Sequence, residues 1–513
     1  MAGRAVTLIA AALAAAILLL LAAPLLALGL RLGAFSLGPA DLAAIRFTVT
    51  QAALSALVSV LLAVPVARAL ARRRFRGRET LVTLLGAPFL LPTIVAVLGL
   101  IAVFGRAGWF SQILALAGLP PVPLYGLQGV VLAHVFFNLP LAVRLLLQGW
   151  QAIPAERFRL AASLGFGARD LFRHIEWPML RAVLPGAALV IFTICLSSFA
   201  VALTMGGGPS ATTVELAIYQ ALRFEFDLPA AARLALVQFL LCAAAFALAG
   251  RIARPEGFGA GLGRTGAPPA PGGIVRVLDA VVILLAAGFL LLPLAAVLLR
   301  GLPGLASLPP QVWQAALRSI VVALCSTALT MAVALPLALA AARPGRVWPG
   351  LAATLPLASS SLVLGTGLFL IALPLVRPAD LALPVTMLVN ALLALPFAFR
   401  ILAADARRLD EDHARLARSL DMPGLARLRY LILPRLARPA GFAAGIAAAF
   451  SMGDLGVIAL FATERELTLP LMVQQLMGSF RTQTAASAAL LLVVLSFGLF
   501  WIFDRWGRHH AAA

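Results

Sequence analysis

The chain alternates long apolar runs with short polar segments. The first run, TLIAAALAAAILLLLAAPLLALGL at 7–30, is longer than the roughly 20 apolar residues that cross a bilayer as a helix. Runs of this kind recur to the end of the chain, and together they predict an all-α polytopic membrane protein with about twelve spans. The predicted spans are 7–30, 47–70, 80–104, 126–149, 183–205, 229–249, 275–299, 314–342, 347–375, 381–404, 439–461 and 485–503.

The second half of the chain repeats the first at a fixed distance. LPLAVRLL at 139–146 returns as LPFAFRIL at 395–402, a displacement of 256 residues (395 − 139 = 256). A segment rich in glycine and proline lies between the halves and predicts a flexible linker. The predicted organisation is a first six-helix half at 1–250, a cytoplasmic linker at 251–276 and a second six-helix half at 277–513. Because six is even, both halves enter the membrane in the same direction, which predicts a parallel pseudo-two-fold axis along the membrane normal.

Composition and charge agree with a membrane protein. Of the 513 residues, 62% are hydrophobic and 12% are charged, whereas a soluble domain has about a quarter charged residues. The formal net charge is +20, and the chain contains arginine but no lysine. With a cytoplasmic N-terminus, the arginine-rich segments 67–80 and 504–510 fall inside, and the loops 105–125 and 206–228 fall outside with few arginines, as the positive-inside rule requires. We therefore predict cytoplasmic N- and C-termini, and we attribute the charge to topology, not to nucleic-acid binding.

One arginine-rich segment occurs in both halves, between the fourth and fifth predicted spans of each. The first copy, 155–180, contains RLAASLGFGARDLFRHIEWP, and the second, 411–436, contains RLARSLDMPGLARLRYLILP. Gly165 in the first copy is predicted to adopt the left-handed conformation that ends a helix and turns the chain. Ordinary inside loops would explain the arginines but not the recurrence of length, spacing and terminal proline. We therefore predict two equivalent docking elements for a two-fold symmetric cytoplasmic partner.

The chain carries no motif of an energy-converting or metal-dependent enzyme. Without lysine it cannot form the P-loop GxxxxGK[ST], and HExxH, GxSxG and CxxC are absent. The histidines and cysteines are not spaced as ligands, so we expect no metal and no cofactor in this chain. His134 falls within the fourth predicted span, where a hydrogen-bonded packing role is expected. Acidic residues are scarce within the spans, which argues against an ion-coupled carrier.

The repeated segment resembles the cytoplasmic coupling motif of ABC importer permeases, in which Glu-Ala-Ala precedes a glycine and an Ile/Val-x-Leu-Pro ending. The resemblance implies that both copies, called the coupling segments below, contact an ATPase. The residues implied are Arg159, Ala161, Gly165, Ile175 and Pro178 in the first copy and Arg415, Ala417, Asp421, Leu433 and Pro434 in the second. Arginine replaces the usual glutamate in both copies, and Asp421 replaces the turn glycine. Aspartate tolerates the left-handed conformation better than most residues, so the second copy is also expected to turn.

Three segments of the first half resemble the fused two-half permeases of bacterial thiamine and thiamine pyrophosphate ABC importers. They are YGLQGVVLAHVFFNLPLAVRLLLQ (125–148), IPAERFRLAASLGFGARDLFRHIEWP (153–178) and GGGPSATTVELAIYQALRFEFD (206–227). The resemblance implies a bacterial inner-membrane permease that receives thiamine or phosphorylated thiamine from a periplasmic thiamine-binding protein. It also implies two copies of a cytoplasmic ATPase that bind and hydrolyse ATP, and no enzyme activity in this chain. A permease of the same architecture for ferric iron or another small solute is one alternative, and an ion-coupled carrier or a membrane enzyme is another.

The outer side of each half carries a related short segment after the fifth span. TVELAIYQ, at the end of 206–220, is predicted to form a short helix that dips towards the mouth of the pathway, although an ordinary connecting loop is the alternative. LTLPLMVQQL at 467–476 takes the corresponding place in the second half, two residues out of register (474 − 220 = 254). The predicted outer gate contains Glu215, Tyr219, Gln220 and Gln474.

Overall fold

The structure is a computed structural model that describes residues 2–33, 36–85, 90–252, 272–343, 345–420, 422, 424–463 and 466–511. The described residues form helices joined by turns and loops, with no strand among them. Eleven helical segments are long and apolar enough to span a membrane, and one further helix pair, bent by 87°, counts as a twelfth when taken as one span. Each of the twelve predicted spans overlaps one of these, so the all-α, many-span architecture is confirmed.

The first half begins with α1 and ends with α12. In chain order its helices are α1 (Ala2–Leu30), α2 (Pro39–Arg72), α3 (Arg78–Leu84), α4 (Thr93–Phe104), α5 (Trp109–Leu116), α6 (Leu127–Gln151), α7 (Ala155–Ser163), α8 (Ala168–Leu171), the π-helix η2 (Phe172–Glu176), α9 (Trp177–Leu196), α10 (Phe199–Met205), η3 (Pro209–Ala211), α11 (Val214–Gln220), η4 (Ala221–Glu225) and α12 (Leu228–Ile252). Residues 253–271 of the predicted linker lie outside the described residues.

The second half repeats this order of elements. Its helices are α13 (Ile274–Gly301), η5 (Leu302–Ser307), α14 (Pro310–Ala341), α15 (Trp348–Thr354), η6 (Leu355–Ala358), α16 (Ser361–Ala372), η7 (Pro378–Leu381), α17 (Ala382–Ser419), α18 (Gly424–Arg427), the π-helix η8 (Leu428–Ile432), α19 (Leu433–Gly453), α20 (Gly456–Phe461), α21 (Leu469–Gly478) and α22 (Thr482–Ala511).

In addition to the 87° bend within the predicted span 347–375, the predicted spans 183–205 and 439–461 contain equivalent helix breaks that the apolar pattern does not indicate. In the first half α9 ends at Leu196 and α10 begins at Phe199, with Ser198 in an extended conformation (φ −88°, ψ 95°). In the second half α19 ends at Gly453 and α20 begins at Gly456, with Asp454 extended (φ −69°, ψ 133°). The two breaks are equivalent, because Ser198 and Asp454 are separated by the repeat distance (454 − 198 = 256).

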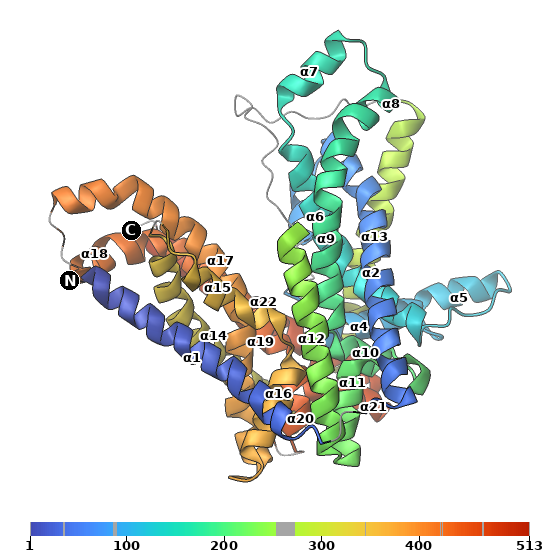
Figure 1. Cartoon of the computed structure of the whole chain (residues 1–513). Helices are drawn as coiled ribbons and strands as arrows, with labels where there is room; N and C mark the ends of the chain where they lie inside the picture. The colour runs from blue at the N-terminus through green and yellow to red at the C-terminus, as the bar shows by residue number, and fades with distance from the viewer. Residues whose placement is uncertain are drawn as a thin grey trace.

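The helices form two arms that diverge towards the coupling segments (Figure 1). One arm contains α2, α6, α9 and α12 and carries α7 and α8 at its far end, and the other contains α14, α17 and α19 and carries α18 at its far end. The arms meet at the opposite end, where α12 packs against α16 and α4 packs against α22. Both chain termini lie on the α18 side of the molecule.

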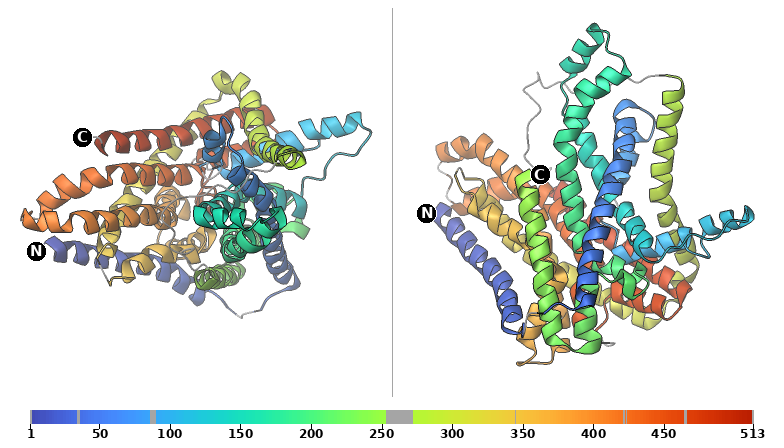
Figure 2. Two further views of the ribbon diagram at one scale, coloured as in Figure 1. Left: turned by 90° about the horizontal axis from the view of Figure 1, so that it is seen from above. Right: turned by 45° about the vertical axis from the view of Figure 1, so that its right-hand side comes forward.

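The first helix of each half packs on the other half. α1 contacts α14, α15 and α16, and α13 contacts α2 and α4. In the right-hand view of Figure 2, α1 runs along the arm of the second half and α13 along the arm of the first. The division of the sequence at the linker therefore does not separate two independent packing units, because each half is held by a helix of the other.

Each exchanged helix crosses the opposite half where a proline meets a glycine. A side-chain carbon added at Gly99 of α4 would lie 2.6 Å from the carbonyl oxygen of Pro293 in α13, and one added at Gly367 of α16 would lie 2.6 Å from that of Pro24 in α1. The two crossings are equivalent, because the interval between the glycines nearly equals that between the prolines (367 − 99 = 268; 293 − 24 = 269). Small residues let helix backbones approach closely in membranes, where packing drives helix association.

We predict that Gly367→Ala lowers the melting temperature of the purified permease, because the added methyl group meets the backbone of α1, which cannot rotate away. The expected cost is about 1–3 kcal/mol. Gly288→Ala in α13 is the matched control, because no atom lies within 4 Å of the added carbon there. Equal melting temperatures for the two variants would show that α1 is not held at this crossing.

Candidate coupling segments and central cavity

The first coupling segment folds as two short helices joined by a glycine turn. Gly165 follows α7 with φ 70°, the left-handed conformation predicted from the sequence. The N–H of Gly165 donates to the carbonyl of Ala162 (3.1 Å), and that of Phe166 donates to the carbonyl of Ala161 (2.9 Å). This pair of bonds is a Schellman motif, which satisfies the last carbonyls of a helix and reverses the chain.

The predicted coupling residues of this copy divide into exposed and buried ones. Arg159 is exposed and forms an ion pair with Glu156 at 3.0 Å. Ala161 and Ile175 are buried in the core of the first arm, so they support the segment from within. Pro178 lies in the first turn of α9, directly after the π-helix η2.

Two exposed leucines of α7 complete the surface of the first coupling segment. Leu160 and Leu164 are 60% and 61% exposed, and their spacing of four residues places them on one face of the helix turn. The repeat pattern did not single them out as site residues, because leucine is common in this chain. Their position in a segment otherwise rich in arginine is the signal that could have identified them.

The second coupling segment repeats the turn but not the helix break that precedes it. The N–H of Met422 donates to the carbonyl of Ala417 (3.1 Å), the counterpart at the repeat distance of the bond from Phe166 to Ala161. α17 runs without interruption into this turn, whereas a break separates α6 from α7. Pro154 stands just before α7, and its counterpart at the repeat distance is Asp410 (410 − 154 = 256), which allows the helix to continue.

The remaining predicted residues of the second copy are placed as follows. Leu433 is exposed and begins α19, with Pro434 next to it in the first turn. Ala417 is buried, like its counterpart in the first copy. Asp421 and the side chain of Arg415 lie outside the described residues.

Both coupling segments join the long helix that follows through a π-helix. η2 and η8 begin one repeat distance apart (428 − 172 = 256) and lead directly into α9 and α19. Single π-turns of this kind are rare and concentrate at functional sites in helices. Their recurrence at the repeat distance identifies the junction as a shared structural element of both halves.

A buried ion pair fixes the base of the first coupling segment to α2. The carboxylate of Glu176, whose side chain is 2% exposed, lies 2.7 Å from Arg68 and 3.6 Å from Arg72. The guanidinium of Arg68 also lies 5.0 Å from the ring centre of Phe172. These arginines belong to the cluster that the sequence explained by topology alone, so the structure gives them a second role.

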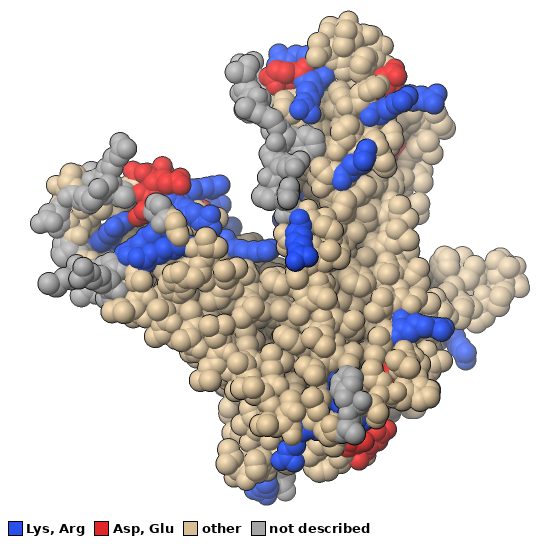
Figure 3. Space-filling model, viewed as in Figure 1, with Lys and Arg blue, Asp and Glu red and all other residues tan. Residues whose placement is uncertain are grey.

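The second coupling segment is held differently. Arg427 of α18 lies 2.8 Å from Asp410 of α17, and both side chains are about one-third exposed. The residue equivalent to Glu176 is Ile432, whose apolar side chain cannot form an ion pair. In the space-filling view, charged side chains gather at the far end of each arm, while much of the surface between these ends is uncharged (Figure 3).

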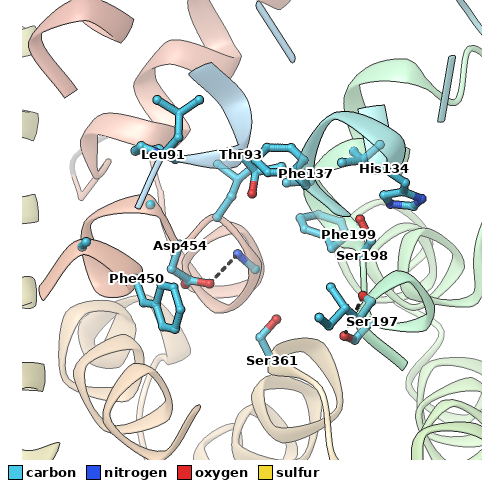
Figure 4. Close-up of a pocket in the computed structure, with 18 of the residues that line it drawn as sticks. Leu91, Thr93, His134, Phe137, Ser197, Ser198, Phe199, Ser361, Phe450 and Asp454 are labelled. Carbon is cyan, nitrogen blue, oxygen red and sulfur yellow. Dashed lines mark hydrogen bonds between the residues drawn. The ribbon is translucent and has the colours of Figure 1, made fainter. Parts of the chain in front are cut away.

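A cavity of about 370 Å³ lies where the two halves meet, and both halves line it. Its wall includes the starts of α4 and α16, parts of α6 and α17, and both helix breaks described above. Figure 4 shows side chains from both halves around this one space. Its position between the arms makes it the candidate centre of a pathway through the protein.

The lining of the cavity comes largely in equivalent pairs. Thr93 and Ser361 are the first residues of α4 and α16. Ser198 and Asp454 occupy the two helix breaks (Figure 4). The cavity therefore follows the pseudo-two-fold relation, with a carboxylate on one side where the other side has a hydroxyl.

Buried hydrogen bonds join the three helices beside the cavity in the first half. Ser55 of α2 is hydrogen-bonded to Nδ1 of His134 in α6 (3.2 Å), so this histidine is hydrogen-bonded as predicted, and it also lines the cavity. Asn138, one turn further along α6, donates to the sulfur of Cys195 in α9 (3.3 Å). Gln51 of α2 donates to the backbone carbonyl of Cys195 (2.9 Å).

The second half has an equivalent set of bonds. Asn390 of α17 donates to Ser451 of α19 (3.1 Å), and Ser451 donates to Ser326 of α14 (3.1 Å). Asn390 and Ser451 are the counterparts, at the repeat distance, of His134 and Cys195 (390 − 134 = 256; 451 − 195 = 256). The same three-helix tie is thus made in both halves with different side chains.

The predicted outer segments form short helices, α11 and α21, which are not among the spanning helices. The N–H of Val214 donates to the hydroxyl of Thr48 in α2 (2.9 Å), and that of Leu469 donates to the hydroxyl of Ser319 in α14 (2.8 Å). These equivalent bonds set an offset of 255 between the segments (469 − 214 = 255). That offset pairs Gln220 with Gln475, the residue next to the glutamine chosen from the sequence.

The predicted gate residues lie in different surroundings. Glu215 is fully buried, and burial raises the pKa of its carboxyl to about 7, although Ser360 and Gln238 facing it lower the pKa. Tyr219 packs against Phe199 with ring centres 5.3 Å apart. Gln220 and Gln474 are half-buried on their respective helices.

Within the described parts of the chain, no group of three or more His, Cys, Asp or Glu side chains is placed to hold a metal ion. Most of the polar side chains around the cavity lie at the helix breaks or form the hydrogen bonds between helices described above. The geometry is that of two linked bundles with a shared central space.

Comparison with known proteins gives consistent matches over nearly the whole chain. Residues 334–509 match the family of binding-protein-dependent transport system inner membrane components. A thiamine transport system permease protein of Salmonella typhimurium is 40% identical over 481 residues, which cover 91% of this chain and 89% of that protein. The corresponding proteins of Brucella abortus and Haemophilus influenzae are 41% and 34% identical, over 90% and 89% of this chain and 87% of each relative.

The matches agree with the all-helical, membrane-spanning architecture. The chain therefore belongs to the thiamine transport system permease proteins, a family of inner-membrane components of binding-protein-dependent transport systems.

Proposed function

We propose that this protein is the membrane permease of an ATP-driven importer that moves thiamine and phosphorylated thiamine into the cytoplasm. The observation that carries the proposal is the 40% identity to a thiamine transport system permease over 91% of the chain. The similarity to this relative extends through both halves and is not limited to residues 334–509, which match the general family of transport components. This breadth supports a shared substrate as well as a shared fold.

Two copies of a cytoplasmic ATPase are the proposed partners of the coupling segments. The same backbone bond forms the turn in both copies, which supports two equivalent contacts. The exposed leucines Leu160 and Leu164 suit an apolar cleft on such a partner. ATP would be bound and hydrolysed by these subunits, and this chain would catalyse no reaction itself.

A periplasmic thiamine-binding protein is the proposed partner on the opposite face. That face holds α11 and α21, and with them the proposed outer gate of Glu215, Tyr219, Gln220 and Gln474. Closure of the two ATPases would draw together the ends of the arms, and the arms would then open towards the binding protein. The three-helix ties beside the cavity support movement of each arm as a rigid body.

We expect a strain that cannot make thiamine, and that lacks any other thiamine importer, to grow on trace thiamine only with this protein, its ATPase and its binding protein together. Each protein is required, because the binding protein delivers thiamine, the permease lets it cross the membrane, and the ATPase supplies the energy. Growth rate against thiamine concentration is the measurement. Growth that persists without the ATPase would indicate an ion-coupled carrier, and no growth with all three parts would exclude thiamine as the substrate.

We expect the termini and the linker to be cytoplasmic, because this orientation places the arginine clusters of 67–80 and of both coupling segments inside. A reporter that is active only in the periplasm should be inactive when fused within 251–276 and active when fused within 206–228. The opposite pattern would reverse the orientation and place the coupling segments outside, away from any cytoplasmic ATPase.

Gly165→Val should leave the amount of protein in the membrane near normal but reduce co-purification of the ATPase and abolish uptake. No atom lies within 4 Å of the added side-chain carbon, so the cost comes from the left-handed backbone, of order 1–3 kcal/mol. That strain would redirect α8 relative to α7. Gly118→Val is the matched control, because Gly118 has the same φ of 70° and equally open surroundings, but lies in a loop after α5. Normal ATPase binding and uptake by Gly165→Val would remove this turn from the coupling contact.

A further inference from the structure

The described wall of the central cavity contains a single carboxylate. Among the described residues that line it, Asp454 carries the only carboxylate, and no arginine is present. The remaining wall consists of hydroxyl groups, the imidazole of His134, the amide of Asn138, backbone, apolar side chains and several aromatic rings. Phe137, Phe397 and Phe450 contribute three of these rings, one from α6 in the first half and two from α17 and α19 in the second.

The carboxylate of Asp454 is only partly satisfied within the protein. Its Oδ1 accepts a bond from the N–H of Gly456 (3.3 Å), at the start of α20. Its Oδ2 is buried and has no hydrogen-bond partner among the described residues. No described basic side chain forms an ion pair with it, although eight such pairs occur elsewhere in the described chain. A buried, unpaired carboxylate is costly unless something supplies the opposite charge.

The pseudo-two-fold relation makes the charge conspicuous. Ser198, the equivalent residue, is the N-cap of α10, and its side chain makes no cap hydrogen bond there. The helix break therefore does not require an acid at position 454. The asymmetry points to a ligand that needs one negative charge and aromatic surroundings.

We propose that the cavity is a binding site for an aromatic organic cation, with Asp454 as its counter-charge and the phenylalanine rings as its apolar and cation–π surface. This inference rests on the proposed function and deepens it. Thiamine in its unphosphorylated form carries a positive thiazolium ring and a second aromatic ring, which match a cavity wall that combines one carboxylate with phenyl groups. The volume of about 370 Å³ falls within the range of small-molecule sites, roughly 300–1,000 Å³.

The same wall disfavours the phosphorylated forms. A pyrophosphate group would bring negative charge near Asp454, and the lining offers no arginine to receive it. A metal cation is also a poor match, because no group of three or more His, Cys, Asp or Glu side chains in the described parts of the chain is placed to hold one. The permease itself would therefore favour thiamine over thiamine pyrophosphate, whichever form the binding protein delivers.

Asp454→Asn tests the charge while keeping the helix break. The asparagine oxygen can accept the Gly456 N–H as aspartate does, because the two residues are equivalent helix caps. The measurement is equilibrium binding of radiolabelled thiamine to the full permease–ATPase complex in lipid nanodiscs, without the binding protein. We expect the dissociation constant for thiamine to rise about tenfold in Asp454→Asn, as for the loss of one partner of a partly buried charge pair.

Asp227→Asn is the matched control. The Asp227 carboxylate also accepts an N–H at a helix start, from Ala230 at 2.9 Å, but it is exposed and outside the cavity. Its loss should leave thiamine binding unchanged. Unchanged binding by Asp454→Asn, or equal weakening by both variants, would overturn the proposal. If adding Ser198→Asp to Asp454→Asn restores thiamine binding, the result would support the proposal. It would show that thiamine needs one negative charge in the cavity, on either side of it.

A comparison on the unaltered complex keeps the proposal testable if Asp454→Asn does not assemble. Thiamine should bind at least about tenfold more tightly than thiamine pyrophosphate, because only the latter brings a negative group beside the carboxylate. Equal or tighter binding of the pyrophosphate would overturn the site as proposed. Failure of the complete importer to take up thiamine would instead contradict the proposed function, so the two failures are distinguishable.

Discussion

Backbone groups that lie inside a bilayer need hydrogen-bond partners within the protein, and this chain breaks its helices inside predicted spans. Where α9 ends, the carbonyl of Cys195 accepts a bond from Gln51, and that of Leu196 accepts one from Gln238, each at 2.9 Å. Hydroxyl groups of α2 and α14 similarly satisfy the first N–H groups of α11 and α21. Because the partners at the end of α9 come from other helices, that break also ties helices together, whereas the bond at the Asp454 break is local, from the N–H of Gly456 to the Asp454 carboxylate.

The two halves keep the same geometry with different chemistry. The turns of the coupling segments, the π-helices and the glycine crossings recur, because each is a backbone feature that the shared fold requires. The polar side chains differ: Glu176 anchors one coupling segment, while Arg427 and Asp410 hold the other. A fused chain can vary its halves separately, whereas two identical subunits cannot. That freedom allows a single carboxylate to stand on one side of a symmetric cavity.

The sequence was sufficient for the spans, the repeat and the Gly165 turn, because bilayer thickness and left-handed backbone impose local requirements on residue type and run length. It was not sufficient for the helix breaks at Ser198 and Asp454, where apolar residues continue on both sides, and at the first break the compensating bonds come from distant helices. The pairing of Arg68 with Glu176 was missed for a related reason. Positive-inside topology already explained the arginine, and its partner belongs to a different helix, far along the chain.

One continuous helix in each half connects the coupling segment with the cavity. α9 begins at the π-helix η2 and ends at the break beside Ser198, and α19 begins at η8 and ends beside Asp454. A helix of 20 residues is about 30 Å long and transmits a tilt along its whole length. α2 is joined to α9 at both ends, through Glu176 near the coupling segment and through Gln51 near the break. Displacement of the first coupling segment must therefore move α2 and α9 together, and with them one wall of the cavity relative to the other.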